Sequence, residues 1–439
     1  MKFSNLPLSL TDMSAPVIGI ASRTQTPKGL RLHIGLFGRR NAGKSSLINA
    51  LTNQKIAIVS DVPGTTTDPV EKACELAPIG PVVFIDTAGV DDVGELGGLR
   101  TERSLAVLGW VDVALIVCDA KALTESELEL IRTVKSTATP TVVVLNKADT
   151  ADAKELIATQ EQVRSLGYEP VTVCANQKLN IDAVREAIVK LAQNAVEPDL
   201  PLLGDLVHPG DTVMLVTPID TGAPKGRMIL PQVQAIREVL DADAKCIVVR
   251  ENRLAETLTN EKKPPAFVVT DSQVVQSVVA QTPKTIPVTT FSIQMAYSKC
   301  DLVEMARGAA MIDFLRPGDK VMICETCSHH PQPDDIGRKK LPRWLAKKVG
   351  GELDIEVVVG KDFPVDLTPY KLILQCGGCV VTRRHMLTRL AQAKRQNIPM
   401  TNYGVAISHL QGVLERALEL HPKALKAFHE AREIFANHF

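Results

Sequence analysis

The sequence predicts an α/β protein in which a phosphate-binding first domain is followed by two further α/β domains. Three observations predict this fold class. From about residue 31 to 195, short apolar runs alternate with amphipathic stretches, which is typical of a parallel sheet with crossover helices. A glycine-rich loop follows the first apolar run. Two proline-bearing segments then divide the rest of the chain, and each precedes its own strand patterns.

The chain's length and charge limit the classes of function. At about 150 residues per domain, 439 residues predict about three domains. Fifty basic residues balance fifty acidic ones, so no overall field favours nucleic acid or an anionic membrane, and neither is expected as a partner. No apolar run approaches the roughly 20 residues that cross a bilayer, so membrane residence is not expected.

Residues 1–30 are polar and predict a flexible N-terminal arm. They lack the basic start and apolar block of a signal peptide, so we expect a cytoplasmic protein. In that reducing compartment the nine cysteines are free thiols, metal ligands or redox groups rather than a disulfide framework.

Strand patterns and prolines give the domain boundaries. The first domain, 31–195, has the strand patterns HIGLFG, VVFIDTAG, VALIVCDA, TVVVLNKAD and VTVCAN. Pro198 and Pro201 mark a linker, and the second domain, 202–283, has DTVMLVTPI, KCIVVRE and AFVVTDS. After the segment QTPKTIPVTT, the third domain, 287–439, has VMICETC, LDIEVVVG and LILQCGGC. Ligands of such sheets bind at the carboxyl ends of the strands.

The glycine-rich loop GRRNAGKS fits G-x-x-x-x-G-K-[ST] between a strand and a helix. Its glycines let backbone N–H groups turn inward around phosphates, and the following helix N-terminus adds positive potential. Lys44 would reach the β and γ phosphates, and Ser45 would offer its hydroxyl to Mg2+. The residues expected to contact the phosphates are Gly38, Asn41, Ala42, Gly43, Lys44, Ser45 and Ser46.

Two further motifs complete a phosphate site. Asp86 begins DTAG at a strand end, where its carboxylate can hold Mg2+ through water and the Gly89 N–H can meet the γ phosphate. The polar loop GTTTD supplies Thr65 and Thr66, whose hydroxyls are of the kind that close over Mg2+ when the γ phosphate is present. Ser45, Thr66 and Asp86 are therefore the expected Mg2+ site.

The loop NKAD predicts the base. A carboxylate at Asp149 can accept hydrogen bonds from two guanine N–H donors that adenine lacks. Asn146 and Lys147 belong to the same loop, and Cys174 and Ala175 lie where a backbone N–H could meet the guanine O6. A helix-entry loop with a capping Asp is the alternative for NKAD alone. Four motifs in this order predict a P-loop GTPase domain that binds GTP and Mg2+ and hydrolyses GTP to GDP and phosphate.

Residues 32–190 resemble the translation-factor class of GTPases, in the branch that includes the tRNA-modification GTPase and Era-like proteins. As in that branch, the residue after DTAG is apolar, Val90, so a glutamine that orients water is missing. Asn41 matches the residue that helps hold a K+ ion in the tRNA-modification relatives, although it could equally be a turn residue. The expected catalytic residues are Asn41, Lys44, Thr66, Asp86 and Gly89.

Two cysteine pairs end strand patterns of the third domain, Cys324 with Cys327 and Cys376 with Cys379. Thiolates at this spacing chelate soft metals. Spacing alone favours a four-cysteine zinc site, although the gap between the pairs exceeds the roughly 15 to 20 residues of a zinc ribbon. A redox dithiol is less favoured, because neither pair opens a helix in a thioredoxin-like unit.

The strings around these cysteines resemble the FeFe-hydrogenase maturation GTPases of the HydF family. CSH at Cys327, QCGGC at Gln375, RLHIGLFGRRNAGKSSLINAL and HHPQPDDIGRKKLPRW carry the resemblance over nearly the whole chain. It implies a dimerisation domain over 202–283 and a domain over 287–439 that binds a 4Fe-4S cluster. It also implies that Cys327, Cys376 and Cys379 ligate the cluster and leave the fourth iron position exchangeable.

This sequence departs from the family at two places. The family's histidine before C-x-x-C is Gln375, and an amide is a poor iron ligand. Cys324 is an additional thiol that could complete a closed four-cysteine site. His329 and His330 are the other candidates for the fourth ligand, or are simply polar surface.

The resemblance also implies a role. A HydF-like scaffold receives a transient two-iron precursor from the radical-SAM hydrogenase maturases and delivers it to apo FeFe-hydrogenase, working as a homodimer. GTP would act as a switch, because hydrolysis releases the loop around Thr65 and Thr66. Two alternatives remain: a regulatory switch GTPase with a structural zinc module, and a tRNA-modifying GTPase. Neutral charge and the lack of interleaved aromatic and basic residues disfavour the latter.

Overall fold

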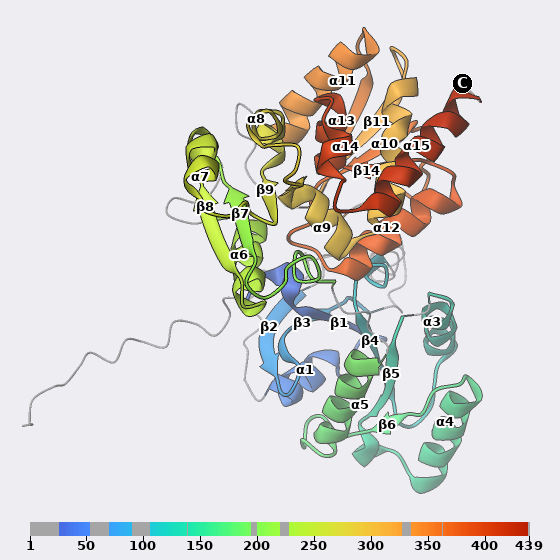
Figure 1. Ribbon diagram of the computed structural model, residues 1–439. Helices are drawn as coiled ribbons and strands as arrows, with labels where there is room; N and C mark the ends of the chain where they lie inside the picture. Colours follow the sequence, from blue (N-terminus) through green and yellow to red (C-terminus); the bar gives the residue numbers. More distant parts are fainter. Residues whose placement is uncertain are drawn as a thin grey trace, which may run out of the picture.

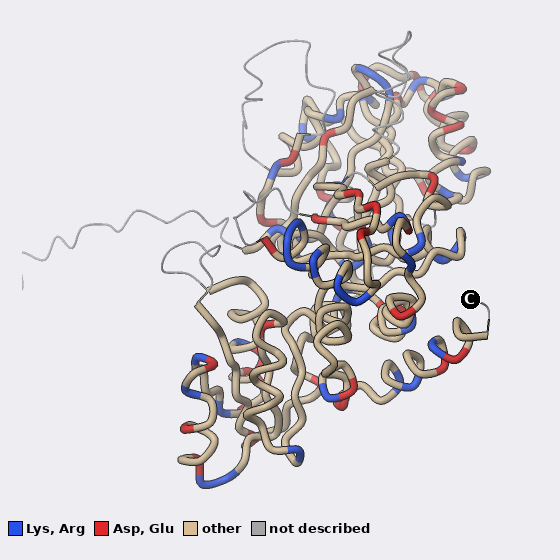
Figure 2. The backbone as a smooth tube through the Cα atoms, turned by 90° about the horizontal axis from the view of Figure 1, so that it is seen from above, with Lys and Arg blue, Asp and Glu red and all other residues tan. Residues whose placement is uncertain are grey.

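The computed structural model contains three α/β domains in the order of the sequence (Figure 1). The predicted fold class is confirmed. The described residues are 26–52, 70–89, 106–137, 139–194, 200–219, 228–326, 335–361 and 363–437. No helix among these ranges is long and apolar enough to cross a membrane. Figure 2 shows that basic and acidic residues are interspersed along much of the chain.

The first domain is built on a six-stranded sheet in the order β2-β3-β1-β4-β5-β6. Five strands run parallel, as the alternating pattern predicts, and β2 is antiparallel to β3. Charged residues in β2 hide it from an apolar-run analysis. The strands are β1 (Leu32–Phe37), β2 (Val70–Leu76), β3 (Gly80–Asp86), β4 (Val113–Asp119), β5 (Thr141–Asn146) and β6 (Val171–Thr172).

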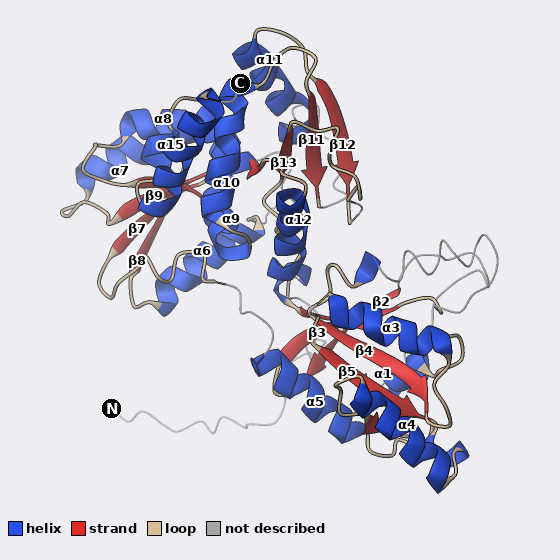
Figure 3. Ribbon diagram, turned by 90° about the vertical axis from the view of Figure 1, so that its right-hand side faces the viewer, coloured by secondary structure: helices blue, strands red, loops and turns tan. Residues whose placement is uncertain are grey.

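Helices cover both faces of this sheet (Figure 3). One buried cluster joins Leu47 and Ile48 of α1 to Val184 and Ile188 of α5. The other face packs against α3 and α4. Burial on both faces explains why strands such as β4 are apolar throughout. The helices are α1 (Lys44–Thr52), α3 (Glu125–Ser136), α4 (Ala153–Ser165) and α5 (Ile181–Asn194).

The second domain has a four-stranded parallel sheet in the order β10-β9-β7-β8. The last strand in sequence corrects a boundary. Val288–Thr290 pairs with β9, so this sheet extends beyond residue 283, into the region that proline spacing assigned to the third domain. The elements are β7 (Thr212–Val216), α6 (Leu230–Asp241), β8 (Lys245–Val249), α7 (Leu254–Asn260), β9 (Phe267–Thr270), α8 (Val275–Gln281) and β10 (Val288–Thr290).

The third domain has a parallel sheet in the order β12-β11-β13-β14. Cys324 pairs in register with Gln375, so the carboxyl ends of β11 and β13 lie side by side. The strands are β11 (Lys320–Glu325), β12 (Asp354–Val359), β13 (Leu372–Gln375) and β14 (Met400–Asn402). The helices are α9 (Phe291–Lys299), α10 (Leu302–Ala309), α11 (Leu341–Val349), α12 (Arg383–Arg395), α13 (Tyr403–Leu410), α14 (Leu414–Ala417) and α15 (Pro422–Ala436).

The first and third domains touch through a charged and aromatic contact. The Lys361 ammonium lies 3.2 Å from the centre of the Trp110 ring and 2.5 Å from a carboxylate oxygen of Glu71. His385 also stacks on Trp110, with its ring centre 6.5 Å from that of the Trp110 ring. Arg384, the residue before it, donates to the Thr139 hydroxyl at 2.8 Å. The start of α12 therefore contacts the first domain (Figure 3).

Candidate functional site

The glycine-rich loop has the backbone that its sequence requires. Gly38 and Gly43 have φ angles of 147° and 94°, which favour glycine. A Cβ at Gly38 would lie 2.2 Å from the Val117 carbonyl oxygen, and one at Gly43 would lie 2.1 Å from the Asn146 side-chain nitrogen. Both positions therefore exclude any side chain, which keeps the loop's backbone close to strands β4 and β5.

Lys44 is buried and its ammonium is held by the loop itself. Nζ donates to the Gly38 carbonyl at 2.9 Å and to the Arg39 carbonyl at 3.0 Å. These bonds place the charge at the N-terminus of α1, where the helix dipole already favours an anion. The site is therefore prepared for phosphate by both a side chain and the backbone.

Two of the three predicted Mg2+ residues, Ser45 and Asp86, lie in contact. Ser45 Oγ donates to Asp86 Oδ2 at 2.6 Å, which joins the start of α1 to the end of β3. Hydroxyl and carboxylate oxygens are the ligands that Mg2+ prefers. Gly89 ends the described segment that carries this motif, and Thr65, Thr66 and Val90 lie outside the described residues.

Asn146 fastens the base-reading loop to the phosphate loop. Its Nδ2 donates to the Ala42 carbonyl at 2.9 Å, and its Oδ1 accepts from the Ala175 N–H at 3.0 Å. Asn146 is 3% exposed, so these bonds are formed away from water. Three segments that are far apart in sequence thereby become one rigid surface.

The Asp149 carboxylate is also held in place. Cys174 Sγ donates to Oδ1 at 3.1 Å and Gln177 Nε2 donates to Oδ2 at 3.0 Å. Lys147, which lies two residues before Asp149, has a φ of 62°, a left-handed conformation that turns the chain sharply. Gln177 was not among the sequence-predicted residues, and only its position just after CAN could have indicated it.

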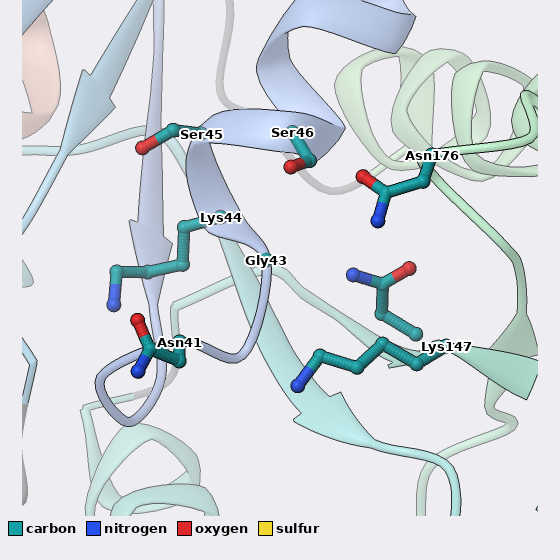
Figure 4. A pocket seen from close by; sticks show the side chains of 8 residues that line it. Asn41, Gly43, Lys44, Ser45, Ser46, Lys147 and Asn176 are labelled. Carbon is teal, nitrogen blue, oxygen red and sulfur yellow. The ribbon is translucent and has the colours of Figure 1, made fainter. Parts of the chain in front are cut away.

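The pocket between these loops has a volume of about 310 Å3 (Figure 4). Lys44 and Asn41 lie on one side of the loop, and Lys147 and Asn176 on the other. The pocket thus brings residues that are predicted to contact phosphate together with residues that are predicted to bind the base. Its lining residues are Asn41, Gly43, Lys44, Ser45, Ser46, Asn146, Lys147 and Asn176.

Asp119, at the end of β4, is a site residue that the sequence analysis missed. Its carboxylate pairs with Arg39 of the phosphate loop at 3.2 Å and with Lys147 of the base-reading loop at 3.3 Å. Burial acts to raise the pKa of Asp119, but the Lys121 N–H and the Lys147 ammonium together lower it below its usual value. A polar residue at the carboxyl end of a buried strand was the only available signal.

The cysteine loop lies at the carboxyl end of β13. Cys376 Sγ lies within hydrogen-bonding distance of the Thr326 N–H at 3.2 Å and of the Thr326 hydroxyl at 3.1 Å. The Gln375 amide nitrogen donates to the same sulfur at 3.4 Å. Donors around a sulfur stabilise the thiolate form that ligates metals. This environment fits Cys376 as a ligand of a soft metal centre.

The neighbouring thiols differ from Cys376. Cys324 packs within the hydrophobic core, and burial raises the pKa of its thiol to about 12. This placement favours a packing role for Cys324. Burial also raises the pKa of Cys379, while the Lys299 ammonium opposes that shift. Cys379 contacts the core of the second domain, so the loop touches two domains.

The described residues hold part of the predicted cluster site. Cys376 and Cys379 share one loop, in which Gly377 has open space around it. Cys327, His329 and His330 lie outside the described residues. Within the described ranges, no three His, Cys, Asp or Glu side chains are grouped closely enough to hold a metal ion.

Comparison with protein families gives three matches, in the same order along the chain as the three domains. Residues 33–147 match the 50S ribosome-binding GTPase family. Residues 202–300 match the hydrogen maturase F dimerization domain, and residues 303–420 match the hydrogen maturase F tetramerization domain. The chain has the domain architecture of the HydF hydrogenase maturases. Both the sequence-based resemblance to HydF and the predicted GTPase are confirmed.

The curated relatives that this chain matches include two GTPases. The GTPase Der of Wolinella succinogenes is 34% identical over 172 residues, which cover 37% of this chain and 36% of that protein. The tRNA modification GTPase MnmE of Trichormus variabilis is 38% identical over 167 residues, covering 37% and 34%. The chain therefore spans about a third of the length of these relatives.

Solved structures show weaker similarity. Aquifex aeolicus Era bound to GDP.AlF4- is 20% identical, with 50% of this chain and 93% of that chain covered and a TM-score of 0.32. The G domain of the T. maritima FeoB iron transporter is 24% identical, with 37% and 99% covered and a TM-score of 0.30. The assignment of the HydF architecture rests on the family matches and not on these structures.

Proposed function

We propose that this chain is a GTPase and iron–sulfur scaffold that carries a two-iron precursor to apo FeFe-hydrogenase. One observation carries the proposal. Two hydrogen maturase F domains follow a GTPase domain whose phosphate and guanine residues line one pocket. The radical-SAM hydrogenase maturases would supply the precursor, and the cytoplasm would be the site of the exchange.

In the nucleotide site, the chain's own residues bind, orient and neutralise GTP. Lys44 would balance charge on the β and γ phosphates, and Asp149 would accept hydrogen bonds from guanine. Ser45, Asp86 and Thr66 would hold Mg2+, which supplies charge stabilisation at the γ phosphate. Gly89 would donate its N–H to that phosphate. Asn41, whose φ is 61°, would help hold a K+ ion. This ion would assist hydrolysis in place of the water-orienting glutamine, because Val90 occupies the glutamine's position.

In the third domain, Cys376 and Cys379 would ligate a 4Fe-4S cluster together with Cys327. The cluster would supply an iron with an exchangeable position, at which the precursor is carried. The Thr326 N–H and the Gln375 amide nitrogen, which donate to Cys376 Sγ, support this ligation. Cys324, His329 and His330 remain the candidates for a fourth ligand, and the burial of Cys324 favours the two histidines.

The second domain would form a homodimer through its exposed apolar edge. Strand β8 is an edge of the sheet, and Val248 on it is 42% exposed. On α6, Val233 is 50% exposed and Leu240 is 57% exposed. A strand edge with apolar side chains is a template for pairing with a second copy. The family name of this domain agrees with such pairing.

The test is the delivery of the precursor. The reconstituted protein, loaded with a synthetic two-iron precursor, is mixed anaerobically with apo FeFe-hydrogenase, and hydrogen evolution is measured. We expect activation by the wild type and by Cys246→Ala, whose thiol lies in the second domain, and none by Cys376→Ala. Equal activation by both variants, or none by the wild type, would contradict the proposal.

A further inference from the structure

Gln375 occupies an unusual place for a polar side chain. It ends β13 between Cys324 of β11 and Asn402 of β14, and it is 0% exposed. A buried amide must satisfy both its oxygen and its nitrogen, so the partners on its two ends determine its orientation.

Arg389 of α12 determines that orientation. Its Nη1 donates to Gln375 Oε1 at 3.0 Å. A guanidinium can only donate, so the carbonyl oxygen must face it. The amide nitrogen consequently faces the other way, where it lies 3.4 Å from the Cys324 carbonyl oxygen and 3.4 Å from Cys376 Sγ. The direction of the hydrogen bond to the sulfur thus follows from the arginine.

Arg389 is itself fixed. It is 2% exposed, its Nη2 donates to the Gly360 carbonyl at 2.9 Å, and its guanidinium carbon lies 5.0 Å from the centre of the Phe363 ring. Rotating the Gln375 amide would put its NH2 group against a buried cation and leave a donor without an acceptor. The arrangement therefore has one stable orientation.

We propose that Gln375 and Arg389 form a positioning pair that sets the reduction potential of an iron–sulfur cluster bound through Cys376. Gln375 acts as a hydrogen-bond donor to the ligand sulfur and not as a metal ligand, because its oxygen is engaged by Arg389. Hydrogen bonds to cluster sulfurs stabilise the more negative, reduced state and so raise the potential. This inference rests on the proposed cluster.

The experiment measures the cluster's reduction potential by anaerobic redox titration, followed by electron paramagnetic resonance. Iron and sulfide are counted on the same samples. Gln375→Leu removes the donor and should lower the potential with iron content unchanged. Gln375→Glu replaces the donor by a carboxylate and should lower the potential further. Arg389→Met frees the amide to rotate and should give a smaller shift in the same direction.

Gln294→Leu is the matched control, because Gln294 is also 0% exposed and bonded, at 2.9 Å, to the Thr289 hydroxyl. It should leave the potential unchanged, and thermal melting shows whether each variant folds. Equal potentials in the wild type and Gln375→Leu would overturn the inference while leaving the cluster intact. Loss of iron in folded Gln375→Leu, as in Cys376→Ala, would make Gln375 a ligand and also overturn it. A wild type that binds no iron would contradict the proposed function itself.

Discussion

The nucleotide pocket and the cysteine loop are both sites at the carboxyl ends of parallel strands, but they are built differently. In the pocket, the backbone determines the geometry of the site. Gly38 and Gly43 admit no side chain, and Lys44 is held by carbonyls of its own loop. At the cysteine loop, Thr326, which follows β11, and Gln375 of β13 contact the Cys376 sulfur, and Arg389 of α12 contacts Gln375.

A sequence reveals a site formed by the main chain more readily than a site formed by side chains of distant segments. A site held by the main chain requires particular residue types at fixed short spacings, so its motif can be recognised in the sequence. A site held by side chains from distant segments imposes no spacing, and its supporting residues emerge only after folding. The two sites should therefore respond differently to substitution.

Lys44→Ala should have the largest effect. Removing the ammonium that neutralises the phosphates should lower the rate of GTP hydrolysis by about 10^2- to 10^3-fold. The measurement is phosphate release at saturating GTP, with Lys154→Ala on the exposed face of α4 as control. A loss below tenfold would mean that the loop's backbone alone supplies the stabilisation.

Asp149→Asn should weaken GTP binding by about 10^2- to 10^4-fold, because the guanine N–H donors lose their carboxylate. An amide can instead donate to the extra carbonyl of xanthine, so affinity for XTP should rise. Isothermal titration with both nucleotides measures the exchange, with Asp182→Asn on α5 as control. Unchanged preference for guanine would place base recognition elsewhere.

Lys361→Met tests the contact between the regions that carry the two sites. The substitution removes the cation over Trp110 and the partner of Glu71, which should lower the free energy of unfolding by about 1–2 kcal/mol. Denaturant unfolding measures the change, and Lys371→Met, at an exposed position, is the control. No difference between the two variants would show that the contact does not stabilise the chain.

The same contact should make stability depend on pH. The His33 ring belongs to this contact, with its centre 6.0 Å from that of the Trp110 ring. Burial lowers the pKa of His33 to about 3, and burial also lowers the pKa of His385 well below 6.5. Below pH 6.5 both histidines bind protons in the unfolded chain, whereas their buried rings stay neutral in the folded protein. Stability is therefore full above pH 6.5 and should fall by up to about 1.4 kcal/mol per histidine for each pH unit below it.

Melting at pH 7.5 and 5.5 measures this loss, and His33→Phe should reduce it. The exposed His208→Phe should not, because its ring is already in water. Equal pH dependence in both variants would contradict the assignment.

The sequence indicated Ser45, Asp86 and Asn146 because they lie in short motifs that follow strands, and the structure brings Ser45 to Asp86 and Asn146 to the phosphate loop. It missed Asp119, whose partners Arg39 and Lys147 come from two different loops. It missed β2 because charges interrupt its apolar pattern, and it ended the second domain too early because β10 is only three residues long.

At the cysteine loop, the sequence supplied the thiols but not their environment. Nothing in the spacing between Gln375 and Arg389 indicates that the Arg389 side chain of α12 contacts Gln375 at the end of β13. Likewise, only packing shows that Cys324 belongs to the hydrophobic core. Both results depend on tertiary contacts that no local pattern encodes.

The most direct test of a GTPase that also holds a cluster is the count of iron and sulfide per chain after anaerobic reconstitution. We expect about four of each in the wild type and in Cys246→Ala, and close to none in Cys376→Ala, with guanine nucleotide binding retained in all three. A colourless wild-type protein that holds tightly bound zinc and no sulfide would contradict the account.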